Sequence, residues 1–277
     1  MDLVKPTEII TAMIQSGTVK AGLGPTDLMI RGALSGGLLG IATSLALGAA
    51  AQTGQLLVGA LIFPVGFVMI VLLGLELVTG SFAVVPMAVM AGKVRFGRMF
   101  TNWCWVFLGN LVGSVAYGGL FVIAVTNAVH VAPAGVAERV RQLAEAKTTG
   151  YAALGMAGML TVFVKAVLCN WMVCMGVVMG LCSTSVIGRI AAAWMPILVF
   201  FAQGFEHTVV NMFVIPAGMM MGAKVGLIDW VIWNLVPVTL GNLVGGFVFV
   251  ALALFVTFAP RPAEPVKVAS LVRTVEP

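Results

Sequence analysis

The stretch GFEHTVVNMF at 204–213 places a glutamate and a histidine side by side in otherwise apolar sequence. Glu206 and His207 are the only ionisable residues between Arg189 and Lys224. Burying an unpaired charge in apolar surroundings is costly, so such residues find a partner or serve a function. Glu206 fits a cap on backbone N–H groups at a helix break, and His207 fits either a hydrogen-bonded core residue or a donor to a small anion. We favour the structural role for Glu206 and the substrate-facing role for His207.

Two motifs of this chain occur twice at nearly the same spacing, which indicates an internal repeat. The Gly, Glu and Pro of the first motif recur at one constant offset, and the second motif recurs at almost the same offset. The pairs are GLELVTGSFAVVP (74–86) with GFEHTVVNMFVIP (204–216), and GNLVG (109–113) with GNLVG (241–245). Glu76 is therefore the counterpart of Glu206 and is expected to support a second helix break. Leu77 occupies the place of His207.

The residues that follow Glu76 predict a loop within an apolar stretch. Leu77, Val78 and Thr79 precede Gly80, a residue type that permits backbone conformations closed to others. Thr79 would offer a hydroxyl group there.

Three phenylalanines are candidates for a constriction. Phe63 and Phe67 are four residues apart and would share a helix face. Such a pair commonly packs in a core, but it also suits a hydrophobic ring that excludes bare ions. Phe200 would supply a matching ring on the other side.

Further polar residues lie within the apolar stretches. Lys165 must reach an interface, pair with an acid, or line a wet cavity. We expect each asparagine to form hydrogen bonds between helices; these are Asn102, Asn110, Asn170, Asn211, Asn234 and Asn242.

Composition places the chain in a membrane. Its 277 residues are 61% hydrophobic and 9% charged, with a mean hydropathy of +1.11, whereas a soluble domain carries about 25% charged residues. The four cysteines lie in apolar segments without metal-ligand spacing, so we expect no disulfide framework and no metal site. Six apolar stretches predict an all-α integral membrane protein with six transmembrane helices; they run about 32–51, 55–92, 99–129, 151–182, 190–223 and 230–259.

The second and fifth stretches are too long for one straight span. About 35 residues of continuous helix would reach roughly 50 Å, against a hydrocarbon core of about 30 Å. They are therefore steeply tilted or broken. With three spans in each half, about 30–129 and 151–259, the second half enters from the opposite side, which gives an inverted-topology repeat.

The basic residues give the orientation by the positive-inside rule. One side would hold Lys5, Lys20, Arg31, Lys93, Arg95, Arg98, Arg189, Arg261, Lys267 and Arg273, and the other Arg139, Arg141, Lys147 and Lys224. Both termini are then cytoplasmic, and the loop 127–150 faces outward. Segment 1–29 is compatible with a short interfacial helix over Thr7–Val19, the channel domain is 30–259, and the tail is 260–277.

Several motifs together resemble the formate/nitrite transporter family over roughly 30–258, most closely the formate-transporter branch found beside formate dehydrogenases. They are ELVTGS, NWCWVFLGNLVG, CNWMVC, GFEHTVVNMFVIP and NLVPVTLGN. The resemblance implies an aquaporin-like protomer with its own pore, assembled as a homopentamer in the inner (cytoplasmic) membrane among its lipids. It implies small monovalent anions such as formate, nitrite or hydrosulfide as substrates. It implies no enzyme activity, no cofactor and no nucleic-acid partner.

The resemblance also assigns roles to residues. Phe63 and Phe67 match the cytoplasmic constriction of the family, and Phe200 matches the periplasmic one. Leu77, Val78 and Thr79 match the loop of the broken second helix, and His207 matches the central histidine, with Thr79 as its partner. Asn170 and Asn242 match the asparagines near the pathway. Two positions depart from the family. Val78 is often phenylalanine in the family, and Leu154 stands where the family has an anion-attracting lysine. Lys147, Lys165 or neither would then take the place of that lysine.

The leading hypothesis is passage of formate with a proton, as the neutral acid, through an apolar zone. Desolvation there raises the pKa of the substrate, and the proton comes from cavity water or from His207. A passive anion channel, in which His207 only donates a hydrogen bond, is the variant. A second class of function is a neutral-solute channel of the aquaporin type, but the chain lacks the NPA pair of aquaporins. A third class is a membrane redox subunit, but His207 alone cannot supply bis-histidine haem ligation.

Overall fold

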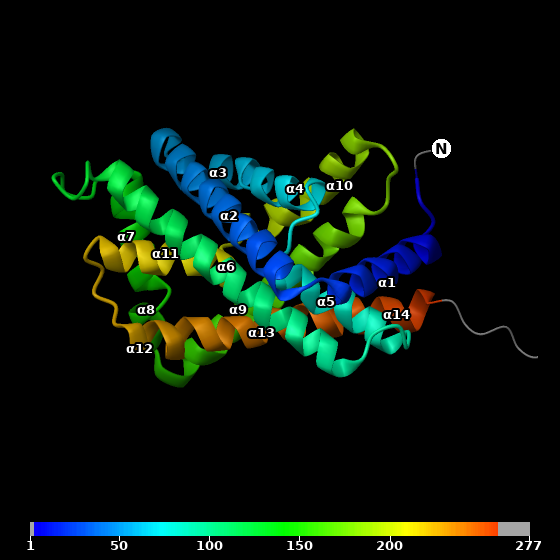
Figure 1. Ribbon diagram of the computed structural model, residues 1–277. Coiled ribbons are helices and arrows are strands. Elements are labelled where there is room, and N and C mark those ends of the chain that lie inside the picture. The colour runs from blue at the N-terminus through cyan, green and yellow to red at the C-terminus, as the bar shows by residue number, and fades with distance from the viewer. Residues whose placement is uncertain (1–2, 260–277) are drawn as a thin grey trace, which may run out of the picture.

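A computed structural model describes residues 3–259 (Figure 1); the predicted tail 260–277 lies outside the described residues. Every regular element of the described part is a helix, and one isolated bridge joins Leu3 to Ser183.

Four helical runs are long and apolar enough to cross a membrane. At 1.5 Å per residue, about 20 residues suffice for a span, so each of these runs exceeds the need. They are α2 (Pro25–Thr53), α6 (Phe96–Val125), α9 (Gly155–Gly180) and the continuous run Leu227–Phe258. That run comprises α12 (Leu227–Trp230), the π-helical η1 (Val231–Leu235), α13 (Val236–Gly246), the π-helical η2 (Phe247–Leu252) and α14 (Ala253–Phe258).

The second and fifth apolar stretches are broken, which decides between the two predicted alternatives. Non-helical segments at 73–77 and 203–207 interrupt them. Gly74 and Gly204 have φ of +63° and +64°, a left-handed conformation that glycine adopts without strain. The pieces are α3 (Leu56–Ile62), α4 (Pro64–Leu72) and α5 (Val78–Met90) in the second stretch, and α10 (Val186–Ala202) and α11 (Thr208–Met220) in the fifth.

The glycines of both GNLVG motifs allow close helix packing, of α6 on α2 and of α13 on α9. A Cβ atom on Gly109 would lie 2.7 Å from the carbonyl oxygen of Met29, and one on Gly241 would lie 2.6 Å from that of Phe163. Real Cβ atoms do not approach so closely, so any larger residue would push the helices apart. The repeated motif therefore sets the same helix contact twice.

Three shorter helices complete the described part: α1 (Pro6–Gly22), α7 (Val136–Ala146) and α8 (Thr149–Ala152). The predicted Thr7–Val19 segment is helical, but it packs against α5 and buries Ile10 and Met13 there. The predicted outer loop contains α7, which packs on α11. Figure 1 shows α1 and α14 at one end of the molecule and α7, α8 and α12 at the other.

Candidate functional site

An asparagine of the first GNLVG motif satisfies the backbone of the first break. The Oδ1 atom of Asn110 accepts a hydrogen bond from the backbone N–H of Val78 at 2.9 Å. Its Nδ2 atom donates to the carbonyl oxygens of Glu76 and Gly32, each at 2.9 Å. One fully buried amide thus ties the break to helix α2.

The asparagine of the second motif repeats this arrangement at the second break. Asn242 accepts from the backbone N–H of Thr208 at 2.9 Å and donates to the carbonyl oxygens of Glu206 at 2.9 Å and Ala166 at 2.8 Å. Both amide hydrogens of Asn242 are therefore used, and none is left for a substrate. The expectation that Glu206 caps backbone N–H groups is wrong: a break exposes both donors and acceptors, and a carboxylate can only accept, whereas the amide of Asn242 accepts and donates.

The two glutamates instead bind lysines. The carboxylate of Glu76 is 2.8 Å from the Nζ atom of Lys20, and that of Glu206 is 2.8 Å from the Nζ atom of Lys147. Both carboxylates are almost fully buried. A buried charge of this kind needs a partner, and each lysine comes from outside the broken helix.

Glu206 has two further donors. The hydroxyl of Tyr151 donates to Oε1 at 2.8 Å, and the Nδ2 atom of Asn211 donates to Oε2 at 2.8 Å. The charge of Glu206 therefore stays hydrogen-bonded even when Lys147 turns away from it.

A cavity of about 170 Å³ lies beside this cluster, and we call it the Lys147 cavity. Its wall includes Lys147, Arg139, Phe200 and His207. It is otherwise mostly apolar, so its positive side chains stand out as binding groups for an anion.

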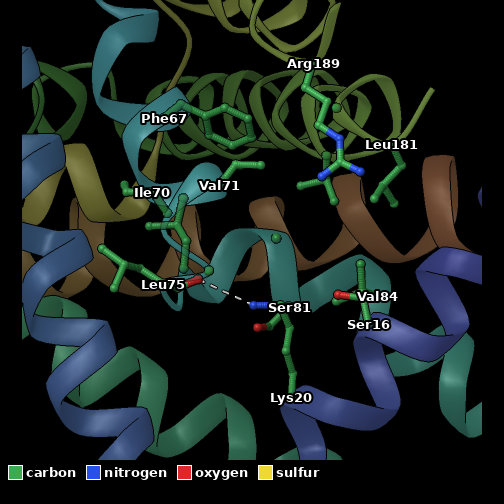
Figure 2. A pocket seen from close by; sticks show the side chains of 15 residues that line it. Ser16, Lys20, Phe67, Ile70, Val71, Leu75, Ser81, Val84, Leu181 and Arg189 are labelled. Atoms are coloured by element: carbon green, nitrogen blue, oxygen red, sulfur yellow. Dashed lines mark hydrogen bonds between the residues drawn. The ribbon is translucent and has the colours of Figure 1, made fainter. Parts of the chain in front are cut away.

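A second cavity, of about 190 Å³, lies beside the first break, and we call it the Lys20 cavity. Figure 2 shows Lys20 and Ser16 on one side of it, Arg189 on the other, and Phe67 and Leu75 between them. Leu77 and Ser81 also line it. Each of the two cavities therefore combines a paired lysine, an arginine and a phenylalanine.

His207 lines the Lys147 cavity, and its hydrogen bonds define its tautomer. Its Nδ1 atom accepts the backbone N–H of Val210 at 3.2 Å, which caps helix α11. The proton of the neutral ring is then on Nε2, which donates to Oγ1 of Thr79 at 3.1 Å. The ring of Phe200 stacks on the imidazole, with centroids 5.7 Å apart. This arrangement leaves the hydroxyl hydrogen of Thr79 available to a third group.

A model of the formate/nitrite transporter family matches residues 7–256. The chain belongs to the formate/nitrite transporter family. It is 33% identical to the uncharacterized transporter YrhG of Bacillus subtilis, over 92% of this chain and 93% of that protein. It is 31% identical to the formate channel BtFdhC of Bacillus thuringiensis, over 92% of this chain and 95% of that protein. It is 38% identical to a probable formate transporter of Methanothermobacter thermautotrophicus, over 71% of this chain and 73% of that protein.

Solved structures agree with this membership. An FNT family ion channel is similar with a TM-score of 0.79 and 27% identity, covering 91% of this chain and 99% of the other. A pentameric formate channel with formate bound is similar with a TM-score of 0.67 and 25% identity, covering 84% and 97%. The protein is therefore a multi-pass membrane protein of a transporter family.

Of the two lysines that the sequence leaves open, only Lys147 lines the cavity that holds His207. The Nζ atom of Lys165 lies 5.8 Å from the ring centroid of Tyr151. Leu154, which stands at the family's lysine position, is 61% exposed. The geometry thus favours Lys147 as the cation of this transporter.

The predicted phenylalanine grouping differs from the structure. Phe67 lines the Lys20 cavity, but the ring of Phe63 stacks on Phe201 at 3.9 Å and meets Phe200 edge-on at 5.5 Å. The reason is that α10 packs against α3, so its phenylalanines reach Phe63.

The predicted loop after Glu76 is wrong for most of its residues: only Leu77 lies in the break, whereas Val78, Thr79 and Gly80 form the first turn of helix α5, because the chain turns earlier, at Gly74. The asparagine prediction falls close to Thr79. Val78 is buried and Asn110 holds its backbone, while Asn170 donates to the carbonyl oxygens of Thr79 at 3.1 Å and of Asn242 at 2.6 Å. Asn170 of helix α9 therefore joins the first turn of α5 to α13 with both of its amide hydrogens.

Sequence reasoning missed the partners of the two glutamates, Lys20 and Tyr151. Lys20 precedes Glu76 by nearly the same number of residues as Lys147 precedes Glu206. Extending the repeat toward the N-terminus would therefore have shown that the two lysines occupy equivalent positions. No comparable sequence signal marks Tyr151, because its contact with Glu206 depends on how α8 docks.

Proposed function

We propose that this transporter carries a small monovalent weak-acid anion, most suitably formate, across the inner membrane. The observation that carries the proposal is the Thr79–His207 hydrogen bond between two cavities that each hold a lysine. The relatives named as formate channels and the formate-bound neighbour support formate. Nitrite, which has the same charge and two terminal oxygens, is the alternative substrate.

We further propose six spans in two inverted three-helix repeats, 30–129 and 151–259, with both termini in the cytoplasm. The two breaks, each held by the asparagine of a GNLVG motif, support the repeat. The distribution of basic residues supports the orientation, with the Lys20 cavity facing the cytoplasm. The pentameric neighbour supports a homopentamer in which each protomer has its own pore.

Lys147 attracts the anion in this mechanism. Its ammonium group can turn from Glu206 to a substrate, because Tyr151 and Asn211 continue to donate hydrogen bonds to the carboxylate. A positive group in an apolar cavity raises the local concentration of anions.

The zone between the cavities excludes a bare charge. Phe200 lines one cavity, and Phe67 and Leu77 line the other. As formate loses water there, its own pKa rises, and it takes a proton that entered through cavity water. The neutral acid passes Thr79, whose hydroxyl hydrogen bonds a substrate oxygen, and it releases the proton on the far side.

His207 acts in this scheme as a fixed hydrogen-bond donor. Protonation at Nδ1 would remove the acceptor of the Val210 N–H and undo the cap of helix α11. The imidazole therefore orients the hydroxyl of Thr79, and the transported proton comes from water.

The test is stopped-flow flux into proteoliposomes with formate, nitrite, hydrosulfide and lactate at two pH values. We expect formate and nitrite to be carried, and lactate to be carried more slowly because it is larger. His207→Asn should lower formate flux and leave its pH dependence unchanged. Absence of flux for all four substrates would overturn the transport proposal, and a changed pH dependence would restore a proton relay through His207.

A further inference from the structure

Three buried polar atoms beside the first break make no hydrogen bond among the described residues. They are Oε2 of Glu76, Oγ of Ser81 and Oδ1 of Asn102. Each of the three residues is 1% exposed. Buried polar groups without a partner are rare in folded proteins, and an ordered water commonly accounts for them.

The equivalent residues of the second half show what is missing. The offsets of the two repeated motifs relate the three to Glu206, Asn211 and Asn234. There, the Nδ2 atom of Asn211 donates one hydrogen to Oε2 of Glu206 at 2.8 Å and the other to Oδ1 of Asn234 at 3.0 Å. A single amide group therefore supplies both donors.

The surrounding geometry is the same in the two halves. The Nδ2 atom of Asn102 donates to the carbonyl oxygen of Lys20 at 3.0 Å, and that of Asn234 donates to the carbonyl oxygen of Lys147 at 2.9 Å. The two acceptors on the first side are consequently oriented as on the second. The hydroxymethyl side chain of Ser81 is shorter than that of Asn211 and carries no amide group, so no side chain of the described residues supplies the two hydrogens that Asn211 supplies in the second half.

We propose that one ordered water molecule occupies this place, held by Ser81, Glu76 and Asn102. The water accepts the hydroxyl hydrogen of Ser81 and donates its two hydrogens to Oε2 of Glu76 and Oδ1 of Asn102. All three orphaned atoms are then satisfied, and the water makes the three hydrogen bonds typical of buried water.

The charge of the surroundings selects water over a cation. The ammonium group of Lys20 lies 2.8 Å from Oε1 of Glu76, so the carboxylate is already neutralised and a second positive charge is repelled. Ser81 also lines the Lys20 cavity, which gives the water a route of entry. The first glutamate is thus supported by an exchangeable solvent molecule and the second by fixed side chains.

The direct test is a structure at a resolution that shows ordered water, for the wild type and for Ser81→Asn. We expect a density peak between the three side chains in the wild type. In Ser81→Asn the new amide should occupy that place, as Asn211 does in the other half. A wild-type map that shows other buried waters but none here would overturn the proposal.

Asn211→Ser is the matched variant, because it transfers the proposed site to the second half. We expect a new water between Glu206 and Asn234 in its map. An anomalous peak at the Ser81 site in crystals grown with rubidium salt would assign a cation instead of water and overturn the proposal.

Thermal unfolding in detergent gives an independent readout. Ser81→Asn should unfold at or above the wild-type temperature, and Ser81→Ala should unfold a few degrees below it, because the water loses a donor. An equal loss in both variants would contradict the water bridge. The site stands on buried geometry alone, so a failed formate assay would leave this outcome unaffected.

Discussion

The breaks at 73–77 and 203–207 share one framework but differ in how they support their glutamates. In each, an asparagine satisfies the backbone and a lysine pairs with the acid. Glu206 has two additional protein donors, whereas one oxygen of Glu76 has none among the described residues. In the proposed mechanism Lys147 can exchange partners because two protein donors remain on Glu206, and no such protein donors stand behind Lys20. The proposed mechanism thus uses one repeated scaffold in two ways, with Lys147 as its mobile cation and Lys20 as a fixed partner of Glu76.

The residue that follows each glutamate also differs between the two halves: it is apolar after Glu76 and polar after Glu206. Leu77 lines the Lys20 cavity and makes no side-chain cap, while His207 lines the Lys147 cavity, caps helix α11 and orients Thr79. The Thr79–His207 hydrogen bond, which the proposed mechanism places against the substrate, therefore joins one residue of each half. This arrangement suits a single contact point near the centre of the molecule.

The largest effect is expected where the two breaks are alike. Asn242→Ala leaves two carbonyl oxygens and one N–H without partners, at about 1–3 kcal/mol for each buried group. We expect the variant to unfold many degrees below the wild type in detergent, and Asn110→Ala to behave alike. Unequal losses, with one variant close to the wild type, would contradict the shared framework.

The second prediction separates the two lysines. Lys20→Ala should destabilise the fold by about 1–3 kcal/mol. Removing one partner of a fully buried ion pair costs about 3–5 kcal/mol, and the loss here is smaller because Lys20 is partly exposed. Lys147→Ala should lose less stability, since Tyr151 and Asn211 remain, but should lower formate flux by roughly tenfold or more.

Thermal unfolding and proteoliposome flux, measured on the same preparations, test this separation. If Lys147→Ala loses stability and keeps its flux, the assignment of Lys147 as the mobile cation is wrong.

The third prediction concerns the hydroxyl at the centre. Thr79→Val keeps the shape but removes the donor, so formate flux should fall about tenfold, the value of one hydrogen bond. Thr79→Ser should retain most of the flux. Equal flux in the valine and serine variants would show that Thr79 does not contact the substrate.

A smaller effect is expected at the cavity arginines, one on each side. Arg189→Gln and Arg139→Gln remove partly solvated charges, so formate flux at low ionic strength should fall by only a few-fold. Added salt of about 0.5 M should remove the difference, because it screens such charges. Arg95→Gln, outside both cavities, is the control.

The sequence indicated the two breaks as one of two alternatives, the other being steep tilt, and it placed the first break about four residues too late, after Glu76 instead of at 73–77. Glycine at 74 and 204, the acid two residues later and the constant offset are all visible in the chain. It also predicted that the asparagines bond between helices, but not which groups they meet. Residue type limits the kind of partner, whereas tertiary packing selects it.

Lys20, Tyr151 and Phe63 show the limit of such reasoning. Lys20 reaches Glu76 only because α1 packs on α5. Phe63 meets Phe200 because α10 lies against α3. Helical periodicity describes faces within one helix, and these contacts depend on how separate helices dock.

The smallest effect is expected in α7, which packs on α11 beside the Lys147 cavity. Arg141 donates two hydrogen bonds to Glu138 and holds the pKa of that carboxyl at about 2, below its ordinary 4.5. Because the folded-state pKa is lowered, the pair stabilises the protein above the ordinary value, and this stabilisation is lost as pH falls from 4.5 toward 2. Glu138→Gln should therefore unfold slightly below the wild type at neutral pH, with the difference shrinking across that window.

Glu8→Gln, on α1 at the opposite end, is the matched control for this pH dependence. Glu8 makes no ion pair among residues 3–259, so its variant should track the wild type at every pH. The effect of Glu138 remains small because the pair is exposed to water and screened by salt. A pH-independent gap between Glu138→Gln and the wild type would mean that this side chain acts through helix packing and not through its charge.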